Sequence, residues 1–381
     1  MLLFIVGACS GNEQTDKSTS TDNNEIVTGE SEWTIHRGIN LSYWLSQNFQ
    51  DAARYPYGTV NRYTRINEAS IKMIADAGFD HVRFPLDEVE MWTENHNQYK
   101  TSFNLMHDVV GWCIKYKLRV LVDLHVIRSH NFTGAENKLW TDVSAQDWLV
   151  EMWKQLNNEL KVYSTGSVAY EFLNEPVADE SQSYKWNEMV SKLITNIRPL
   201  SPNRKLFIGP NRWQSIDFLS KLSLPDDKDL VLSVHFYEPM LLTHYKASWL
   251  PEFNVSGVVS YPGMLLSQKD IANIPTSQYD QIKYMLQSEY DREYIYGRFK
   301  KAYDYAKSKN LPIYLGEFGC IIENVPTQAR QQWYKDMVSV LDELQIPYSV
   351  WDLYGAFSVF DPQTGKPIND VVFSTITHGS K

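Results

Sequence analysis

Cysteine is scarce in this chain of 381 residues, which has only Cys9, Cys113 and Cys320. Cys9 lies in an amino-terminal leader, so Cys113 and Cys320 are the one pair that could form a disulfide within the folded part. Cys113 falls within a helical pattern, which favours buried packing over chemistry. Nothing in the sequence requires the bond, and a disulfide is therefore left open rather than predicted.

Positive charge is also in deficit. The chain has 36 Lys and Arg residues against 46 Asp and Glu residues, which gives a formal net charge of −10. An acidic surface argues against nucleic acid and against anionic polymers as partners. A neutral polymer remains compatible with this charge.

Long apolar runs are missing as well, since the apolar segment Leu2–Ala8 is too short to span a bilayer. With Cys9 it resembles the end of a bacterial lipoprotein signal, in which Cys9 is acylated, although the usual positive n-region is missing. Residues 10–32 are polar and predict a flexible tether. We therefore expect a leader over residues 1–9 and an exported protein. It would be a cell-surface or outer-membrane lipoprotein, or otherwise periplasmic or extracellular.

The chain does contain enough apolar material for a large core, with 43% hydrophobic and 22% charged residues. Residues 33–381 exceed an average domain but suit a single α/β barrel. Aromatic residues amount to 13%, with 12 Trp and 23 Tyr. These rings either pack in the core or line a cleft, as sugar binding needs, and composition does not separate the two.

After Trp33, short apolar runs alternate with amphipathic stretches. Runs such as Val120-Leu121-Val122 indicate strands that are buried on both faces, as parallel sheets require. Eight such strands alternating with helices predict a (β/α)8 TIM barrel. An open doubly wound sheet is the alternative, but it needs a Gly-rich phosphate turn after the first strand, which the segment 40–44 does not supply.

The boundaries of these elements follow from the same pattern. Strands are expected at Gly38–Ser42, His81–Pro85, Arg119–His125, Val168–Leu173, Leu206–Gly209, Leu230–Tyr237, Ile313–Gly316 and Tyr348–Trp351. Helices are expected at Asn67–Ala77, Ser144–Tyr163, Tyr184–Arg198, Glu293–Lys309 and Thr327–Leu344.

One connection is longer than a barrel needs. It covers about residues 238–292, after the sixth predicted strand, and is dense in Tyr, Trp, Pro and Ser. Long connections within compact domains are usually functional, and this one starts where barrel active sites lie. We interpret it as an inserted subdomain over the cleft. A structural cap without substrate contact is the alternative.

Polar or aromatic residues close six of the eight predicted strands, at the end where barrel enzymes carry their active sites. Each of them alone has an ordinary structural explanation, but their occurrence together predicts one site. The residues are Arg83, His125, Asn174 with Glu175, His235 with Tyr237, Glu317 and Trp351.

Two of these strand ends offer a glutamate. Glu175 follows the fourth strand and Glu317 closes the seventh, and these strands face each other across the mouth of a closed barrel. Glycoside hydrolysis needs such a pair, in which one carboxylic acid protonates the leaving oxygen and the other group attacks the anomeric carbon. Direct attack requires a separation of about 5–5.5 Å, against about 6.5–9.5 Å when a water molecule must fit between.

The neighbouring residues fit a division of labour between the two carboxyl groups. The acid must stay protonated at rest, which a nearby negative nucleophile enforces. Arg83 can hold the nucleophile ionised through a charge-assisted hydrogen bond, and Tyr237 can bond to the same carboxylate. The other candidates are Asn174 for the sugar 2-hydroxyl, His125 and His235 for hydroxyls or for orienting the carboxylates, and Trp351 as a flat face for a sugar ring.

The order and spacing of these strand ends resemble glycoside hydrolase family 5, the cellulase family. The matching segments are HVRFP, VDLH, FLNEP, VHFYEP, LGEFG and VWD, between residue 36 and about residue 365. The resemblance implies a retaining mechanism with Glu175 as acid/base and Glu317 as nucleophile. We expect no cofactor and no metal ion.

Within this family the chain is most similar to the endoglucanase C type, through the segments GINLSYWLSQ, DAGFDHVRFP and VHFYEPMLLTHYKASW. That type has a subdomain after the sixth strand. It implies β-1,4 or mixed β-1,3/1,4-glucans as substrates and adds Trp249 and Trp44 as substrate-binding residues. The loops after His125 and Trp351 depart from the type, and because both shape sugar subsites, the exact glucan stays open.

Several functions share this core. A β-1,3 or β-1,6-glucanase or β-glucosidase, a mannanase and a xyloglucan hydrolase remain alternatives, as does the choice between endo and exo action. A non-catalytic glycan-binding barrel and a metal-dependent hydrolase using His125 and His235 are further alternatives. We expect a β-glucan polysaccharide or oligosaccharide as partner, membrane contact only through the lipid anchor, and a monomer.

Overall fold

The structure is a computed structural model that describes residues 32–47, 66–134 and 137–379. The predicted leader with Cys9, and the tether apart from Glu32, lie outside the described residues. Their assignments therefore stay predictions.

The described chain folds into a closed barrel of eight parallel strands in sequence order, and the predicted TIM barrel is confirmed. The first and last strands close the ring through pairs such as Gly38 with Ser349. The strands are β1 Arg37–Asn40, β2 His81–Asp87, β3 Arg119–Val126, β4 Val168–Glu171, β5 Leu206–Ile208, β6 Leu230–His235, β7 Ile313–Phe318 and β8 Tyr348–Val350. All eight lie where the apolar runs predict them, with ends that differ by three residues or fewer.

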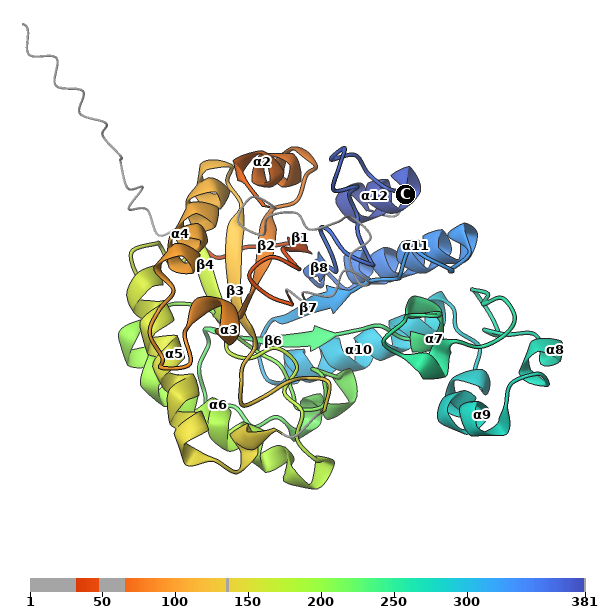
Figure 1. Cartoon of the computed structure of the whole chain (residues 1–381), viewed down its shortest axis with the longest axis horizontal. Coiled ribbons are helices and arrows are strands. Elements are labelled where there is room, and N and C mark those ends of the chain that lie inside the picture. The colour runs from red at the N-terminus through yellow and green to blue at the C-terminus, as the bar shows by residue number, and fades with distance from the viewer. Residues whose placement is uncertain (1–31, 48–65, 135–136, 380–381) are drawn as a thin grey trace, which may run out of the picture.

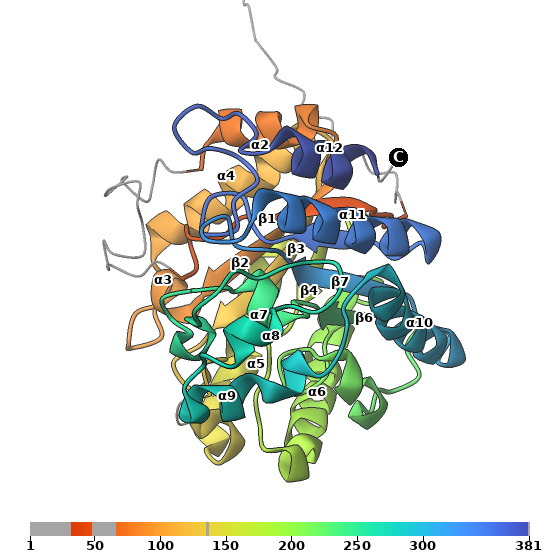
Figure 2. The same cartoon turned by 90° about the vertical axis from the view of Figure 1, so that its right-hand side faces the viewer.

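Helices surround the barrel and cover the outer face of its strands (Figures 1 and 2). The five predicted helices are present, and the longest of them, α5, shows why they form. The Asp142 side chain caps its first turn by accepting from the Ser144 backbone, and its buried residues, such as Leu149, Trp153 and Leu160, recur at helical spacing. The α-helices are α2 Glu68–Asp76, α3 Glu88–Met91, α4 Lys100–Lys115, α5 Val143–Leu160, α6 Ser183–Ile197, α7 Met240–Thr243, α8 Gln268–Ile271, α9 Thr276–Ile282, α10 Arg292–Ser308, α11 Thr327–Glu343 and α12 Asp370–His378.

The amino-terminal end of the barrel is filled by a small apolar layer. Five inward side chains from consecutive strands form it, and Trp33 and Ile35 pack against it from below. The indole of Trp33 meets the ring of Phe207 edge to face, with ring centres 6.1 Å apart. This end is therefore closed by packing, as a filled barrel interior requires. The five residues are Leu121, Ala169, Phe207, Val231 and Tyr314.

The long connection after β6 holds α7, α8 and α9 and projects from the barrel as a lobe (Figures 1 and 2). The lobe is tied to the barrel helices by polar contacts at its start and near its middle. Glu238 accepts hydrogen bonds from Tyr294 at 2.5 Å and from Arg298 at 2.7 Å, both on α10. The Tyr261 hydroxyl donates to Asp336 of α11 at 2.7 Å. The boundaries of an insert at about 238–292 stay a prediction.

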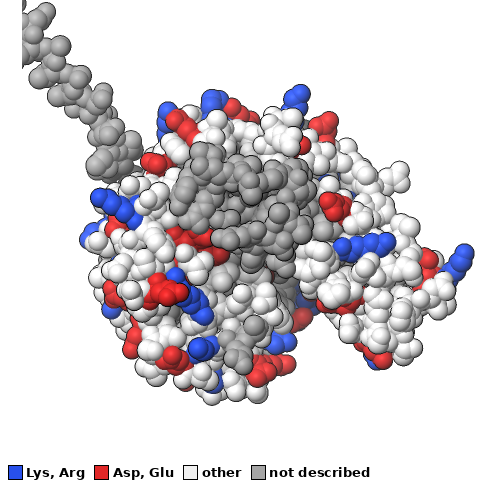
Figure 3. Space-filling view, in the orientation of Figure 1, with Lys and Arg blue, Asp and Glu red and all other residues white. Residues whose placement is uncertain are grey.

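Cys113 and Cys320 are both free and buried, so the disulfide left open by the sequence is not formed. Among the described helices, none combines the length and apolarity that crossing a membrane requires. On the face shown in Figure 3, the described Lys and Arg side chains are interspersed with Asp and Glu and gather into no single basic area.

Candidate active site

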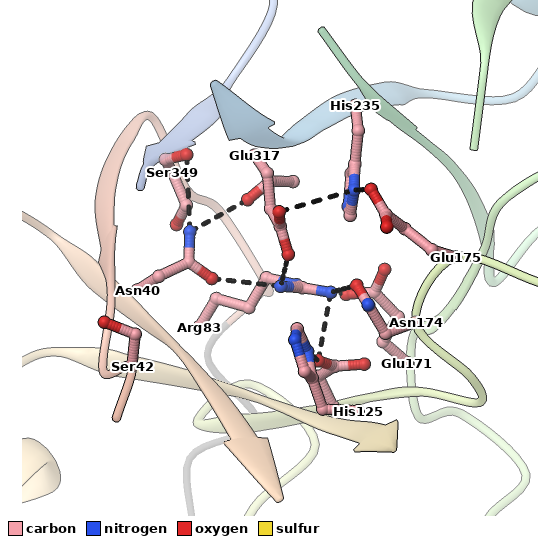
Figure 4. Close-up of polar contacts among 12 residues, drawn as sticks. Asn40, Ser42, Arg83, His125, Glu171, Asn174, Glu175, His235, Glu317 and Ser349 are labelled. Atoms are coloured by element: carbon pink, nitrogen blue, oxygen red, sulfur yellow. Dashed lines mark hydrogen bonds and ion pairs between the residues drawn. The ribbon is translucent and has the colours of Figure 1, made fainter. Parts of the chain in front are cut away.

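The polar side chains expected at the strand ends meet at the carboxyl-terminal end of the barrel (Figure 4). Glu317 is the penultimate residue of β7 and pairs with His235, which ends β6. Glu175 lies just beyond β4 and faces both of them. Parallel strands bring all their carboxyl ends to the same rim, which is why residues far apart in sequence converge here.

Arg83 of β2 lies at the centre of this group and is fully buried. Its guanidinium contacts three carboxylates, Glu317 at 2.7 Å, Glu171 at 2.7 Å and Asp123 at 3.0 Å. It also donates to the side-chain oxygens of Asn174 at 2.9 Å and Asn40 at 3.0 Å. With five acceptors around its planar fork, Arg83 is fixed in orientation and in turn orients Glu317.

Glu175 and Glu317 approach each other on either side of His235. The His235 Nδ1 atom lies 2.9 Å from Glu175 Oε1 and 3.6 Å from Glu317 Oε2. One carboxylate oxygen of Glu175 lies within 4.8 Å of one of Glu317. This approach is closer to the spacing of about 5–5.5 Å for direct attack than to the spacing of about 6.5–9.5 Å that an inverting enzyme needs for its water.

The two carboxyl groups sit in different electrostatic surroundings. Burial, and then the negative charge of Glu317, raise the pKa of Glu175 well above its usual range. Burial also raises the pKa of Glu317, but the Arg83 guanidinium and the Tyr237 hydroxyl, 3.0 Å from Oε2, oppose that rise. These surroundings favour the protonated form at Glu175 more strongly than at Glu317.

Two histidines line the site as neutral rings. Burial lowers the pKa of His235 well below its usual range and lowers that of His125 to about 3. The His125 ring is held by Asp123 at 2.7 Å on Nδ1 and by the Gln47 side chain at 3.0 Å on Nε2. Both of its nitrogens have partners, which fits an orienting role better than direct binding of a hydroxyl.

Of the three tryptophans predicted to bind substrate, one lies in the site, one lies in the lobe and the third, Trp44, lies in the core. Trp351 lies in the site and stacks on His125 with ring centres 5.6 Å apart and planes 9° apart. Trp249, which is 37% exposed, lies in the lobe, and its ring centre is 6.3 Å from that of Phe357. The ring centre of Phe357, which is buried, in turn lies 5.8 Å from that of Tyr237, so contacting rings lead from the site to the exposed Trp249 in the lobe.

The assignment of Trp44 to the cleft is wrong. Its side chain is fully buried in the main core, stacked on Phe84 with ring centres 5.6 Å apart. The chain after β1 turns sharply through Tyr43, at φ 55°, and Gln47, at φ 48°. This turn directs Trp44 toward the core and Gln47 toward His125.

Sequence reasoning missed the buried residues beneath the site. Asp123 and Glu171 point into the barrel from within β3 and β4 and contact Arg83. A charged residue inside an apolar strand is the signal that could have found them. Trp213 was also missed. It is 39% exposed, follows β5, and its backbone N–H donates to the carbonyl of Pro176, next to Glu175, at 3.4 Å.

Glu175, His235 and Glu317 also form the one group among the described residues with the spacing of a metal site. His125 is not part of it, so the metal-dependent alternative loses one of its two proposed ligands. Glu317 already receives Arg83 and Tyr237, and a cation held here would meet the positive guanidinium. The group is therefore two carboxyl groups on either side of the His235 imidazole, one of them already bound to Arg83.

Comparison with known proteins places these observations in a family. The family model for Cellulase (glycosyl hydrolase family 5) matches residues 20–356. Endoglucanase C of Acetivibrio thermocellus is 31% identical over 320 residues, which cover 83% of this chain and 90% of that protein. Cellodextrinase A of Ruminococcus flavefaciens is 28% identical over 303 residues, with coverage of 79% and 80%.

Solved structures agree on the fold. A hyperthermophilic endo-β-1,4-glucanase in complex with substrate has a TM-score of 0.70 and 25% identity, and the match covers 90% of this chain and 96% of that one. Endoglucanase Cel5A of Thermotoga maritima has a TM-score of 0.69 at 22% identity, with the same coverage.

Proposed function

The chain belongs to the cellulase family, glycosyl hydrolase family 5, and from this we propose that it is a retaining endo-β-glucanase in which Glu175 is the acid/base and Glu317 the nucleophile. The observation that carries the assignment is the asymmetry of the pair. Arg83 and Tyr237 both donate hydrogen bonds to the Glu317 carboxylate, whereas the Glu175 carboxyl group is hydrogen-bonded to the neutral ring of His235. The separation within 4.8 Å supports retention.

In the first step, protonated Glu175 donates its proton to the glycosidic oxygen while the Glu317 carboxylate attacks the anomeric carbon. The bond from that carbon to the leaving oxygen breaks, a glycosyl ester forms on Glu317, and the shortened glucan leaves as an alcohol. Beneath the attacking group, Arg83 donates a hydrogen bond of 2.9 Å to the side-chain oxygen of Asn174. The Asn174 amide nitrogen is then available for the sugar 2-hydroxyl, a bond that strengthens in the transition state.

In the second step, Glu175 acts as a base. Esterification removes the negative charge of Glu317, which is one of the causes of the raised pKa of Glu175. The pKa of Glu175 therefore falls when the ester forms, and the carboxylate can take a proton from an incoming water. The hydroxide attacks the anomeric carbon, the ester bond breaks, and Glu317 is again ionised and Glu175 again protonated.

The mechanism is tested with an aryl β-cellobioside in two ways. We expect NMR to show the β-anomer as the first product, and a 2-deoxy-2-fluoro cellobioside to label Glu317. Glu317→Ala and Glu175→Ala should each nearly abolish turnover, and azide should rescue Glu175→Ala with a β-cellobiosyl azide product. An α-anomer as first product would falsify the retaining assignment, and full activity in either variant would sink the assigned roles.

A β-1,4 or mixed β-1,3/1,4-linked glucan is the proposed substrate. The support is the likeness to proteins named as endoglucanases and a cellodextrinase, and the contacting rings of Tyr237 and Phe357, which lead from the site to the exposed Trp249 in the lobe. Product profiles on soluble cellulose, mixed-linkage glucan, laminarin, mannan and xyloglucan test it. If the enzyme releases oligosaccharides faster from mannan, xyloglucan or laminarin than from cellulose or mixed-linkage glucan, the substrate is the polysaccharide that is cleaved fastest.

We also propose that the protein is exported, acts as a monomer and is anchored by acylation of Cys9. The support is the apolar segment ending in Val6-Gly7-Ala8-Cys9 and the polar tether after it. The wild-type chain should incorporate labelled palmitate in a bacterial host, and Cys9→Ser should not. If the wild-type protein is exported but incorporates no labelled palmitate, it is secreted without a lipid anchor.

A further inference from the structure

Glu171 is a buried carboxylate that the reaction above does not use. It lies inside the barrel on β4, four positions before Glu175. Its Oε2 atom accepts from Arg83 Nε at 2.7 Å, and its Oε1 atom accepts from Gln214 Nε2 at 2.9 Å and from Ser233 at 3.1 Å. A carboxylate at this depth is costly to keep ionised, so its partners matter.

Gln214 connects this carboxylate to the acid side of the site. Its side-chain oxygen accepts from the backbone N–H of Glu175 at 3.0 Å, while its amide group donates to Glu171. Its backbone carbonyl accepts from the N–H of His235 at 3.1 Å. One fully buried residue thus holds the main chain of both Glu175 and His235, whose side chains meet above it.

A continuous path of hydrogen bonds therefore runs beneath the two carboxyl groups. It leads from Glu317 to Arg83, to Glu171, to Gln214 and then to the backbone of Glu175. Each link is 3.0 Å or shorter. The path fixes the acid relative to the nucleophile from below, independently of the contact through the imidazole above.

The backbone at both ends of the last link adopts an unusual conformation. Glu175 has φ 44° and Gln214 has φ 52°, in the left-handed region that side chains other than glycine rarely occupy. Such conformations persist where the surrounding structure holds them and are common at active sites. Gly209 supports this arrangement, because a Cβ atom there would lie 2.2 Å from Gln214 Cγ.

We propose that Glu171 and Gln214 are positioning residues that hold the Glu175 carboxyl where it can protonate the leaving oxygen. The inference rests on the proposed role of Glu175 as the acid. A proton donor must lie within hydrogen-bond reach of its target, and a displacement of about 1 Å can cost about 10²-fold in rate. Glu171 is thereby more than a counter-charge for Arg83.

The test uses leaving groups that differ in their need for a proton. Gln214→Met keeps the length of the side chain but removes both amide hydrogen bonds. We expect kcat/KM of the full chain to fall by about 10²-fold for phenyl β-cellobioside, which needs protonation. For the dinitrophenyl compound, which leaves unprotonated, we expect little change. Gln332→Met is the matched control, because Gln332 Nε2 donates to Asp336 at 2.8 Å away from the path, and it should change neither rate.

The outcomes separate this inference from the proposed function. A steeper dependence on the leaving group in Gln214→Met alone supports positioning. An equal loss for both compounds, measured per folded molecule, overturns it and leaves the mechanism standing. A wild-type chain that hydrolyses neither compound overturns the proposed function, and the inference falls with it.

Exchanging the two partners gives a second test that keeps the core filled. Glu171→Gln alone places two amides face to face, and Gln214→Glu alone places two carboxylates face to face. The double variant restores an amide opposite a carboxylate, with acceptors for Arg83 and for the Glu175 backbone. We expect it to recover at least tenfold in phenyl cellobioside hydrolysis over the weaker single variant. No recovery would overturn the proposal that this contact positions the acid.

Discussion

At each end of the barrel a histidine ring is buried beside an aspartate, but the two pairs have opposite surroundings. At the amino-terminal end, His81 Nδ1 lies 2.6 Å from Asp80, and its Nε2 faces the Tyr314 hydroxyl at 3.0 Å. At the carboxyl-terminal end, His125 lies 2.7 Å from Asp123. Burial raises the pKa of Asp123 to about 7. At Asp80 burial also favours the neutral form, but the contact with His81 and the backbone hydrogen bonds from His36 and Arg37 together outweigh it, and the pKa is lowered.

The difference between the two pairs shows that negative charge is left unbalanced at the carboxyl-terminal end. At the carboxyl-terminal end, four carboxyl groups converge on Arg83, which contacts three of them. At the opposite end the groups satisfy one another, and the apolar layer that packs against Trp33 closes the interior. The groove at that end, of about 440 Å³, has no carboxylate among its lining residues. Proton transfer requires carboxyl groups whose charge is not fully balanced, as at the carboxyl-terminal end. Stability is better served by groups that satisfy one another, as at the amino-terminal end. The four carboxyl groups are Asp123, Glu171, Glu175 and Glu317.

The largest effect is expected from Glu317→Gln. It should reduce kcat on an aryl cellobioside by more than about 10⁴-fold, because no other group can form the ester. The free energy of unfolding should stay the same or rise by about 1 kcal/mol, since one of several like charges is removed. Rates and urea unfolding measure the two quantities. A large loss of stability would mean that the Glu317 carboxylate stabilises the fold, which would contradict the comparison between the two ends.

The opposite end should give the opposite result. His81→Leu leaves Tyr314 and Ser349, which lies 3.3 Å from the ring, without their buried partner. We expect the free energy of unfolding to fall by about 2–4 kcal/mol and kcat/KM of the folded enzyme to stay unchanged. If the rate falls as well, the two ends are coupled through the barrel, and the comparison fails.

A matched tyrosine pair sharpens the comparison. Tyr237→Phe removes a hydrogen bond to ionised Glu317, which should lower kcat/KM by about 10- to 100-fold. That bond favours the ionised form, so its loss raises the pKa of Glu317 and moves the acidic limb of the pH–rate profile to higher pH. Tyr314→Phe should lower stability by about 1 kcal/mol and leave the profile in place. A shift of the limb in Tyr314→Phe would contradict the assignment of that limb to Glu317.

Much of the carboxyl-terminal end could be predicted from sequence because strand ends are easy to find. Glu175 and Glu317 each come at the end of a mainly apolar run, and Arg83 lies within the HVRFP segment of the second strand; a parallel barrel brings the ends of such strands to one rim. The rings were harder to place, because a ring beyond a strand turns inward or outward according to backbone angles that the sequence does not display.

Trp44 and Trp213 illustrate this limit. Both follow a strand within a polar segment, yet Trp44 packs in the core and Trp213 is exposed beside the Glu175 loop. Trp213 is placed by three consecutive residues with positive φ, Arg212, Trp213 and Gln214. Such runs of left-handed residues without glycine carry no local sequence signature. The path through Glu171 was invisible for the same reason, because it depends on Gln214.

The smallest effect is expected from Trp249, where the carboxyl-terminal end extends into the lobe. The ring is 37% exposed and contacts Phe357, so Trp249→Ala should leave stability and the hydrolysis of a dinitrophenyl cellobioside unchanged. On a long glucan, loss of a stacking face worth about 0.5–1.5 kcal/mol should lower kcat/KM by about 2- to 10-fold. Tyr303→Ala, in the groove at the opposite end, should affect neither substrate. If Trp249→Ala leaves the glucan rate unchanged, the lobe is a structural cap, and the functional end of the barrel stops at its rim.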